Sequence, residues 1–259
     1  MRHFTTIVTS NNLVCENFYE MVFSWKTDEK PPRPGQFFTI LASKNTVPLL
    51  RRPFAFSGFN VKTGNASMIY KKCGTATEIL SKKLYKDHID IIGPLGNSFV
   101  DYDLGINNIL ISGGAGFGPM LFFKNHLIDI GKKVLMITGA RTSAQIPQNA
   151  RLDPEKAITI CTEDGSEGFC GTVIDYLKSQ PEKLFAGAMI FCCGPVVMLK
   201  ACHDFASSLN LECFVSMEQV MACGVGACMG CAVNITGAGQ FARVCTEGPI
   251  FNSKTIAWT

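Results

Sequence analysis

The sequence predicts three parts in order along the chain: an antiparallel β barrel, a doubly wound parallel sheet of the α/β class, and a small cysteine-rich C-terminal domain. Short apolar runs separated by turn residues fill positions 1–101, strand-like and helix-like segments alternate over 102–216, and residues 217–259 hold four cysteines. At 259 residues the chain is long enough for two domains of roughly 100 to 150 residues and a short appendage.

The composition excludes several classes of protein. Hydrophobic residues make up 47% of the chain and charged residues only 17%, which argues against disorder. The net charge of +3 is too small for the basic stripe that a nucleic-acid binder needs. So few charges also indicate that a cofactor or a partner covers part of the surface.

The chain shows no signal for secretion or membrane insertion. The polar run at positions 5–12 takes the place of the apolar segment of a signal peptide. Two uncharged stretches, 106–123 and 219–242, contain too many glycine, proline or cysteine residues to form lipid-exposed helices. Twelve cysteines without a secretion signal favour a reducing cytoplasm, where cysteines serve as metal ligands, redox groups or small buried residues. We therefore expect a cytoplasmic protein with no membrane span.

The first part is expected to form strands with one helical interruption. The apolar runs lie at 18–25, 36–41, 53–59, 66–72 and 88–92. A helix is expected over Thr77–Leu84, with Thr77 as its cap and Glu78 in its first turn. Ile79, Leu80 and Leu84 would share the buried face of this helix.

The second part alternates strands and helices. Strands are expected at 108–112, 134–138, 158–161, 188–193 and 213–215. Helices are expected at about 119–130, ended by Gly131, and at 172–178 and 196–209. Such alternation predicts a doubly wound parallel sheet that ends near Ser216.

Four cysteines near the C-terminus have the spacing of a plant-type [2Fe-2S] ligand set. The pattern is C-x4-C-x2-C, thirteen further residues and a fourth cysteine, formed by Cys223, Cys228, Cys231 and Cys245. The residues between them are small, so the loop can wrap a cluster and aim N–H groups at the sulfurs. Arg243 is a candidate partner for the cluster's negative charge. The alternative is a structural zinc site, although zinc ligands more often come as two C-x2-C pairs.

Two turns in the second part are candidate phosphate sites. Residues 111–119 form a glycine-rich turn between a strand and a helix, which can bring the backbone close to a pyrophosphate. The turn at Cys193, Gly194 and Pro195 follows another strand at the same sheet edge. A polar loop at 162–168 follows a third strand. Each of these segments also occurs in proteins that bind no nucleotide.

The barrel carries two candidate anion sites. Arg51 and Arg52 precede Pro53 at the start of an apolar strand, where an arginine can hold a diphosphate. The turn from Gly74 to Thr77 opens a helix and offers backbone N–H groups. The alternative is a solvated surface arginine pair beside an ordinary turn.

In order, these segments resemble the electron-transfer subunits of dihydroorotate dehydrogenases, iron–sulfur flavoproteins of the ferredoxin-reductase-like family. The resemblance covers nearly the whole chain. The matching stretches are 34–37, 51–53, 70–77, 93–97, 113–119, 163–166, 193–200, 216–228, 243–245 and 247–249.

The resemblance implies an FAD-binding barrel, an NAD-binding α/β domain and a [2Fe-2S] domain, with boundaries at 1–101, 102–216 and 217–259. The residues matching the family's FAD site are Arg52, Pro53, Phe54, Ala55, Tyr70, Gly74 and Thr77. Those matching its NAD site are Gly114, Gly116, Glu163, Asp164, Cys193, Gly194 and Pro195. No residue of this chain is expected to act as a general acid or base.

The resemblance also implies the reaction and the partner. NAD(H) exchanges a hydride and the cluster exchanges single electrons, so FAD must stand between them. The partner would be an FMN-containing dihydroorotate dehydrogenase catalytic subunit of pyrimidine biosynthesis, in a heterotetramer. The uncharged run 219–242 predicts a covered face, with Met221, Val225 and Met229 at or near the contact.

Three positions depart from the family pattern and leave room for other functions. Ala55 stands where the flavin motif usually has serine or threonine, Ala76 replaces a glycine, and Gly118 replaces a proline. The chain could instead serve a hydrogenase, a sulfur reductase or a ferredoxin:NADP reductase complex. An alternative from another class is a zinc-stapled interaction module that binds no nucleotide.

Overall fold

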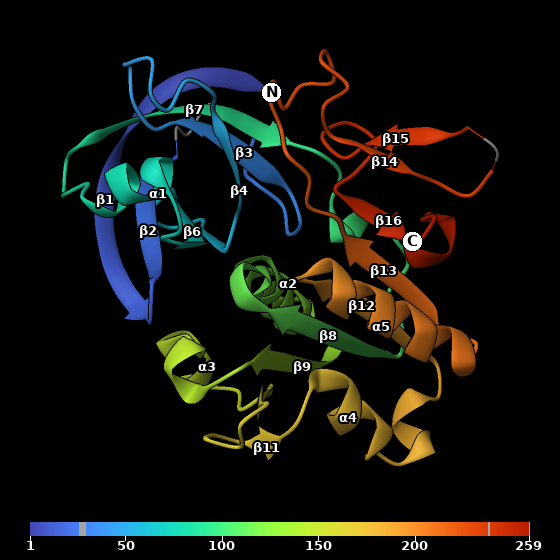
Figure 1. Ribbon diagram of the computed structural model, residues 1–259. Helices are drawn as coiled ribbons and strands as arrows, with labels where there is room; N and C mark the ends of the chain where they lie inside the picture. The colour runs from blue at the N-terminus through green and yellow to red at the C-terminus, as the bar shows by residue number, and fades with distance from the viewer. Residues whose placement is uncertain (26–29, 238, 259) are drawn as a thin grey trace.

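The computed structural model describes residues 1–25, 30–237 and 239–258. Figure 1 shows a strongly curved antiparallel sheet at the N-terminal end, a second sheet flanked by helices, and a C-terminal segment that lies beside both. The predicted fold class, a barrel followed by an α/β domain and a cysteine-rich segment, is therefore confirmed.

The first sheet has seven antiparallel strands in the order β4-β3-β7-β1-β2-β6-β5. The strands are β1 Arg2–Cys15, β2 Phe18–Ser24, β3 Phe37–Leu41, β4 Arg52–Ala55, β5 Gly58–Asn60, β6 Asn65–Lys71 and β7 His88–Leu95. Strand β4 at one end of the sheet approaches β6 near the other end. The centroids of the Phe54 ring on β4 and the Tyr70 ring on β6 lie 5.9 Å apart in an edge-to-face contact. This contact curls the sheet into the expected barrel.

Strand β1 has no counterpart among the predicted strands. Its polar residues hide the alternation, in which Phe4, Thr6 and Val8 are buried and the residues between them are exposed. One predicted strand, 53–59, is in fact two, because Phe56 and Ser57 separate β4 from β5.

The barrel helix α1 spans Thr75–Ser81, so the predicted bounds and cap are wrong. Gly74 is the N-cap, and the Thr77 hydroxyl accepts hydrogen bonds from the backbone N–H groups of Cys73 and Gly74 at 2.9 and 3.1 Å. Threonine thus caps from the third helical position. Leu80 is buried, but Leu84 lies beyond the helix and is 72% exposed, so the predicted apolar face is shorter.

The second sheet has seven strands in the order β11-β10-β9-β8-β12-β13-β16. They are β8 Asn107–Gly113, β9 Lys133–Ala140, β10 Ile158–Thr162, β11 Phe169–Cys170, β12 Ala188–Cys193, β13 Glu212–Ser216 and β16 Ile250–Asn252. All pairings are parallel except that of β13 with β16. The sheet was expected to end near Ser216, but the C-terminal segment returns to add this antiparallel edge strand.

The helices of this part are α2 Phe117–Asp129, α3 Gln148–Arg151, α4 Val173–Lys178 and α5 Val196–Ser208. Short 3₁₀ segments lie at Phe99–Asp101, Gly114–Gly116, Ser143–Gln145, Glu182–Phe185 and Ser253–Thr255. Helix α2 begins two residues before its predicted start and packs against the barrel. A Cβ at Gly118 would lie 3.1 Å from the Ser57 Cβ and 3.3 Å from the Ile69 Cβ, so glycine allows this close approach.

The C-terminal segment contains the hairpin of β14 Ala232–Asn234 and β15 Phe241–Arg243. Asn97, at the end of the barrel, holds the segment by donating hydrogen bonds to the carbonyls of Glu247 and Ile250 at 3.1 and 2.8 Å. The Asn97 side chain also accepts from the Ile250 N–H at 3.0 Å. These bonds fix the cysteine-rich segment against both sheets.

Within the described part of the chain, no helix has both the length and the hydropathy that a bilayer crossing requires.

Candidate functional sites

The four predicted cluster ligands fall into two pairs of thiols. The sulfurs of Cys231 and Cys245 lie 3.2 Å apart and are buried. Cys223 interacts with Cys228 across the loop, and its sulfur accepts the Val225 N–H at 3.4 Å. The Val225 N–H is the main cause that lowers the pKa of Cys223 to about 6, with burial acting in the opposite sense. The loop is thus built to hold a thiolate, the ligand form that iron requires.

The backbone of this loop depends on two glycines. Gly224 and Gly226 have φ of +71° and +85°, a region that L side chains rarely adopt. A Cβ at Gly224 would lie 2.9 Å from Cγ2 of Thr39 on β3, and one at Gly226 would lie 2.7 Å from Cγ2 of Thr246. The cluster loop therefore lies directly on the barrel.

Arg243 holds the loop from the other side, as expected for a cation near the cluster. Its Nη1 donates to the Gly226 carbonyl at 3.0 Å, and its guanidinium is paired with Glu247. The Arg243 guanidinium lowers the pKa of Glu247 to about 2. Its charge is thus shared between the loop and an acid, which keeps the side chain in place.

The arrangement of the four thiols suits a [2Fe-2S] cluster. Two thiol pairs with N–H groups beside the sulfurs suit a cluster in which two irons share four thiolates. Cys231 and Cys245 are both buried, and burial raises the pKa of the Cys245 thiol to about 11.

The two adjacent arginines of the barrel have different surroundings. Arg51 forms an ion pair with Asp90 on β7 and donates to the Asp90 carbonyl at 3.2 Å. Arg52, on β4, pairs with no carboxylate in the described part of the chain and donates only to the carbonyls of Leu50 and Arg51. Arg51 therefore supports the barrel, and Arg52 is free to bind an anion.

The remaining barrel residues lie around Arg52. Pro53, Phe54 and Ala55 follow it along β4 and are half-buried, while Tyr70 is buried on β6. The Tyr70 hydroxyl donates to Asn11 Oδ1 at 3.0 Å, and burial raises the pKa of Tyr70, so this phenol stays protonated. Ala55 offers no hydroxyl to a ligand on this strand.

The N-terminus of α1 is the second anion site predicted in the barrel. Gly74 is exposed, and a Cβ there would meet nothing within 4 Å. The Thr77 hydroxyl accepts only the N–H groups of Cys73 and Gly74, so the N–H groups of the first helical turn receive no side-chain cap. Ala76 is buried at the second position of α1. The unpaired N–H groups of this turn suit a phosphate oxygen, as the sequence predicted.

The two turns of the second sheet that are predicted to bind a nucleotide, 111–119 and Cys193–Pro195, lie side by side in close backbone contact. They follow β8 and β12, which are paired, with Cys193 beside Ser112. A Cβ at Gly116 would lie 2.0 Å from the carbonyl oxygen of Cys193, and one at Gly194 would lie 3.1 Å from the Gly113 nitrogen. Gly114 is exposed, and a Cβ there would meet nothing within 4 Å. The structure thus brings Gly114 and Gly116 together with Cys193, Gly194 and Pro195.

The two predicted acidic residues lie farther along the same edge. Glu163 and Asp164 are exposed and follow β10, which is separated from β8 by β9. Asp164 accepts two hydrogen bonds from Ser166, which lower its pKa and order the loop. Glu163 has no side-chain partner within the described residues, so its carboxylate is available to a ligand.

The Cys193 thiol is half-buried beside the turn at 111–119. Burial raises its pKa to about 12, while a hydrogen bond with Ser216 acts in the opposite direction. It therefore contributes a small polarisable surface beside the nucleotide turn.

The residues predicted at the partner contact differ in exposure. Met229 is 53% exposed and Val225 is half-buried, whereas Met221 is only 8% exposed and packs in the core, so of the three it is the least able to touch a partner directly. Val220, which the sequence analysis did not single out, is 82% exposed. Val220 and Met221 are adjacent apolar residues that look equivalent in the sequence. Only the fold determines that Met221 turns inward and Val220 outward.

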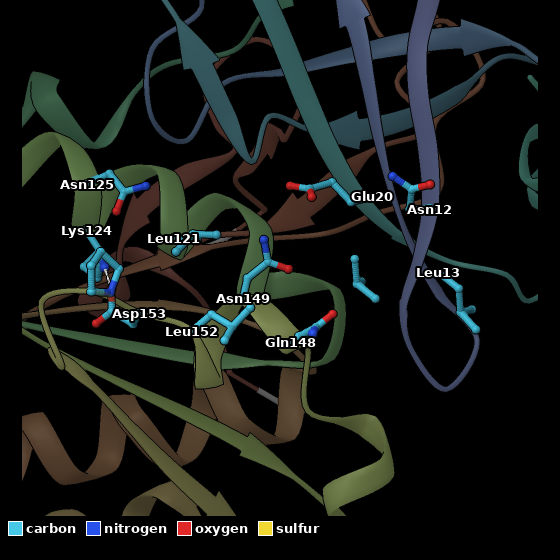
Figure 2. A pocket seen from close by; sticks show the side chains of 12 residues that line it. Asn12, Leu13, Glu20, Leu121, Lys124, Asn125, Gln148, Asn149, Leu152 and Asp153 are labelled. Carbon is cyan, nitrogen blue, oxygen red and sulfur yellow. Dashed lines mark hydrogen bonds and ion pairs between the residues drawn. The ribbon is translucent and has the colours of Figure 1, made fainter. Parts of the chain in front are cut away.

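A separate cavity of about 460 Å³ lies between the β1–β2 hairpin and helices α2 and α3. Figure 2 shows Asn12 and Glu20 on the barrel side and Leu121, Asn125 and Asn149 opposite them. Lys124 and Asp153, which also line the cavity, form a buried ion pair. None of the predicted nucleotide or cluster residues lines this cavity, so it marks the seam between the barrel and the second sheet.

The chain is similar to known proteins over almost its full length. Residues 218–257 match the iron-sulfur cluster binding domain of dihydroorotate dehydrogenase B. The dihydroorotate dehydrogenase B (NAD(+)) electron transfer subunit of Desulforamulus reducens is 34% identical over 249 residues, covering 95% of each chain. That of Bacillus caldolyticus is 31% identical over 252 residues, covering 96% of each chain.

This chain superimposes with a TM-score of 0.83 on the solved structure of an NADH-dependent reduced ferredoxin-NADP oxidoreductase, which was described for flavin-based electron bifurcation. It is 26% identical and the match covers 98% of this chain and 90% of that chain. The identities to the two curated subunits are higher and extend across the barrel, the α/β sheet and the cluster loop. The chain belongs to the family of dihydroorotate dehydrogenase B electron transfer subunits.

Proposed function

We propose that this chain passes electrons between NAD(H) and the FMN of a dihydroorotate dehydrogenase catalytic subunit in pyrimidine biosynthesis, by way of FAD and a [2Fe-2S] cluster. One observation carries the proposal: the cluster loop lies on the barrel at Thr39, and Thr39 pairs with Pro53 of the predicted FAD strand. When bound, FAD supplies the exchange between a hydride and single electrons. The substrate chemistry takes place on the partner.

The chain's own residues bind and position the groups. We propose that Arg52 and the Gly74–Thr77 turn hold the FAD diphosphate, because both offer donors without an acidic partner. Phe54 and Tyr70 would pack beside the flavin. Pro53 and Ala55 would line the same strand.

At the edge of the second sheet, we propose that Gly114, Gly116, Gly194 and Pro195 admit the dinucleotide backbone, with Cys193 beside the nicotinamide. Glu163 and Asp164 would face its ribose end, and the free Glu163 carboxylate can accept hydroxyl donors. We further propose that Cys223, Cys228, Cys231 and Cys245 ligate the cluster.

Two further points rest on the same proposal. We propose the division into domains 1–101, 102–216 and 217–259. It is supported by the sheets, because β1 to β7 form the first and β8 to β13 form the second, while β16 of the C-terminal segment adds one strand to the second sheet. We also propose a cytoplasmic location and a heterotetramer with the FMN subunit, in which Met229, Val220 and Val225 face the partner.

The test is to co-express the chain with an FMN-containing dihydroorotate dehydrogenase subunit and follow NAD⁺ reduction by dihydroorotate. The complex should form NADH, and the catalytic subunit alone should not. A complex that contains FAD and the cluster and yet forms no NADH would contradict the proposal. A second candidate, an electron-input subunit of a ferredoxin–NADP oxidoreductase, is favoured by the 26% identical structure. It would instead show NADH-dependent exchange with ferredoxin.

A further inference from the structure

One buried hydroxyl at the junction of the barrel and the cluster loop has no partner. Among the described residues, Thr39 Oγ1 is the only buried side-chain nitrogen or oxygen without a hydrogen bond. Thr39 as a whole is 2% exposed. Burying a hydroxyl without a partner costs free energy, and valine would fill the same space without that cost. The position of the hydroxyl therefore needs an explanation.

The alternation of β3 determines which side Thr39 faces. Phe38 and Ile40 lie in the core of the barrel, whereas Phe37 belongs to the separate hydrophobic core that also contains Leu95, Cys231 and Cys245. Because successive side chains of a strand point to opposite faces, Thr39 lies on the Phe37 side. This side is the outer face of the barrel that the C-terminal segment covers.

The chain segment that covers Thr39 is the ligand loop itself. A Cβ on Gly224 would lie 2.9 Å from Thr39 Cγ2 and 3.8 Å from Leu95 Cδ1, so the backbone that follows Cys223 rests on the threonine side chain. Cys223 is already surrounded by donors, with the Val225 N–H 3.4 Å from its sulfur. The contact is made by the Thr39 methyl group, and Oγ1 of the same buried side chain has no partner among the described residues, so it is available as one more donor to the sulfur shell of a cluster that this loop would hold.

We propose that Thr39, a residue of the barrel, donates a hydrogen bond to the sulfur shell of the [2Fe-2S] cluster on its Cys223 side and thereby raises the cluster's reduction potential. This inference rests on the proposed function, because it requires the cluster. Donors near the sulfurs stabilise the reduced, more negative cluster, so they make reduction easier. Thr39 is a positioning and tuning residue, and it links the FAD-bearing barrel to the cluster.

The experiment compares wild type, Thr39→Val, Thr39→Ser and Thr6→Val as full chains purified anaerobically with FAD and cluster bound. Thr6 is the matched control, since it is a buried barrel threonine whose hydroxyl donates to the Ser24 carbonyl at 2.5 Å. Cluster and flavin potentials are measured by redox titration with EPR and visible detection. Pulsed EPR of the reduced cluster in D₂O counts the exchangeable deuterons near it.

Thr39→Val should shift the cluster potential to more negative values and remove one deuteron coupling, with the flavin potential unchanged. Thr39→Ser and Thr6→Val should match wild type. An unchanged cluster potential in Thr39→Val, or a shift of the flavin potential alone, overturns the inference and leaves the proposed function intact. If Thr39→Val does not retain the cluster, Thr39→Ala against Thr39→Ser decides in the same way. A wild-type chain without iron and sulfide would overturn both.

Discussion

Replacing Arg51 and replacing Arg52 should affect different properties of the protein, and this difference tests the assignment of the FAD site. Arg52→Met removes a guanidinium that pairs with no acid in the described part of the chain. Arg51→Met removes the arginine partner of Asp90 and leaves His3 Nε2, 2.8 Å from Asp90 Oδ1, as its other side-chain contact. The Arg51 and Asp90 side chains are 17% and 25% exposed. The first change should therefore weaken FAD binding, and the second should weaken the fold.

The magnitudes follow from the contacts. A hydrogen bond between charged groups contributes about 1.5 to 3 kcal/mol, so Arg52→Met should raise the Kd for FAD by about 10- to 150-fold. The apoprotein should keep its melting temperature within a degree or two, because the lost bonds go only to the neighbouring carbonyls of Leu50 and Arg51. Arg51→Met leaves the half-buried Asp90 carboxylate with only His3 beside it and should lower the free energy of unfolding by about 1 to 3 kcal/mol.

The assay is equilibrium FAD binding to the deflavinated full chain, followed by flavin fluorescence, with urea unfolding of the same samples. Iron and sulfide contents serve as the control for the cluster segment. The reasoning would be refuted if Arg51→Met lost FAD selectively while Arg52→Met bound it like wild type.

Three further predictions concern the other sites. Gly116→Ala places a Cβ on the Cys193 carbonyl, so it should cost about 1 to 3 kcal/mol of stability and raise the Kd for NADH, and an unchanged Kd would argue against this turn as the binding site. Burial raises the pKa of Glu20 above its ordinary value of 4.5, so the ionised side chain destabilises the folded protein at pH 7 to 8. Glu20→Gln should therefore have a higher free energy of unfolding than wild type at that pH. The difference should vanish below pH 4.5, where Glu20 of the wild type is also neutral. Val225→Glu should slow electron transfer to the FMN subunit by about tenfold or more while NADH reduction of a small dye stays unchanged, and a parallel loss of both activities would count against a contact there.

Much of the fold could be predicted, because the determining signals are local. The parallel sheet follows from the alternation of apolar runs and helices, and the cluster loop from three ligands within nine residues. Strand β1 could not be found in this way, because its inward position 6 is the polar Thr6 and its outward position 7 is the apolar Ile7, which breaks the alternation. The cap of α1 was misplaced because Thr77 reaches back from inside the helix.

The difference between neighbouring site residues depends on long-range pairing. Arg51 and Arg52 look alike in sequence, and only the contact with Asp90, 39 residues away, separates the structural one from the free one. Likewise, Thr39 is an ordinary strand residue until the register of β3 and the position of Gly224 are known. Met221 and Met229 flank the same loop, yet one is buried and the other exposed.

The most direct test of the central claim is the cofactor content of the anaerobically purified chain, combined with EPR after addition of NADH. We expect about two irons, two sulfides and one FAD per chain, and a reduced-cluster signal that appears with NADH only when FAD is bound. One zinc per chain without sulfide, or a loaded chain whose flavin is reduced by NADH while electrons never reach the cluster, would contradict it.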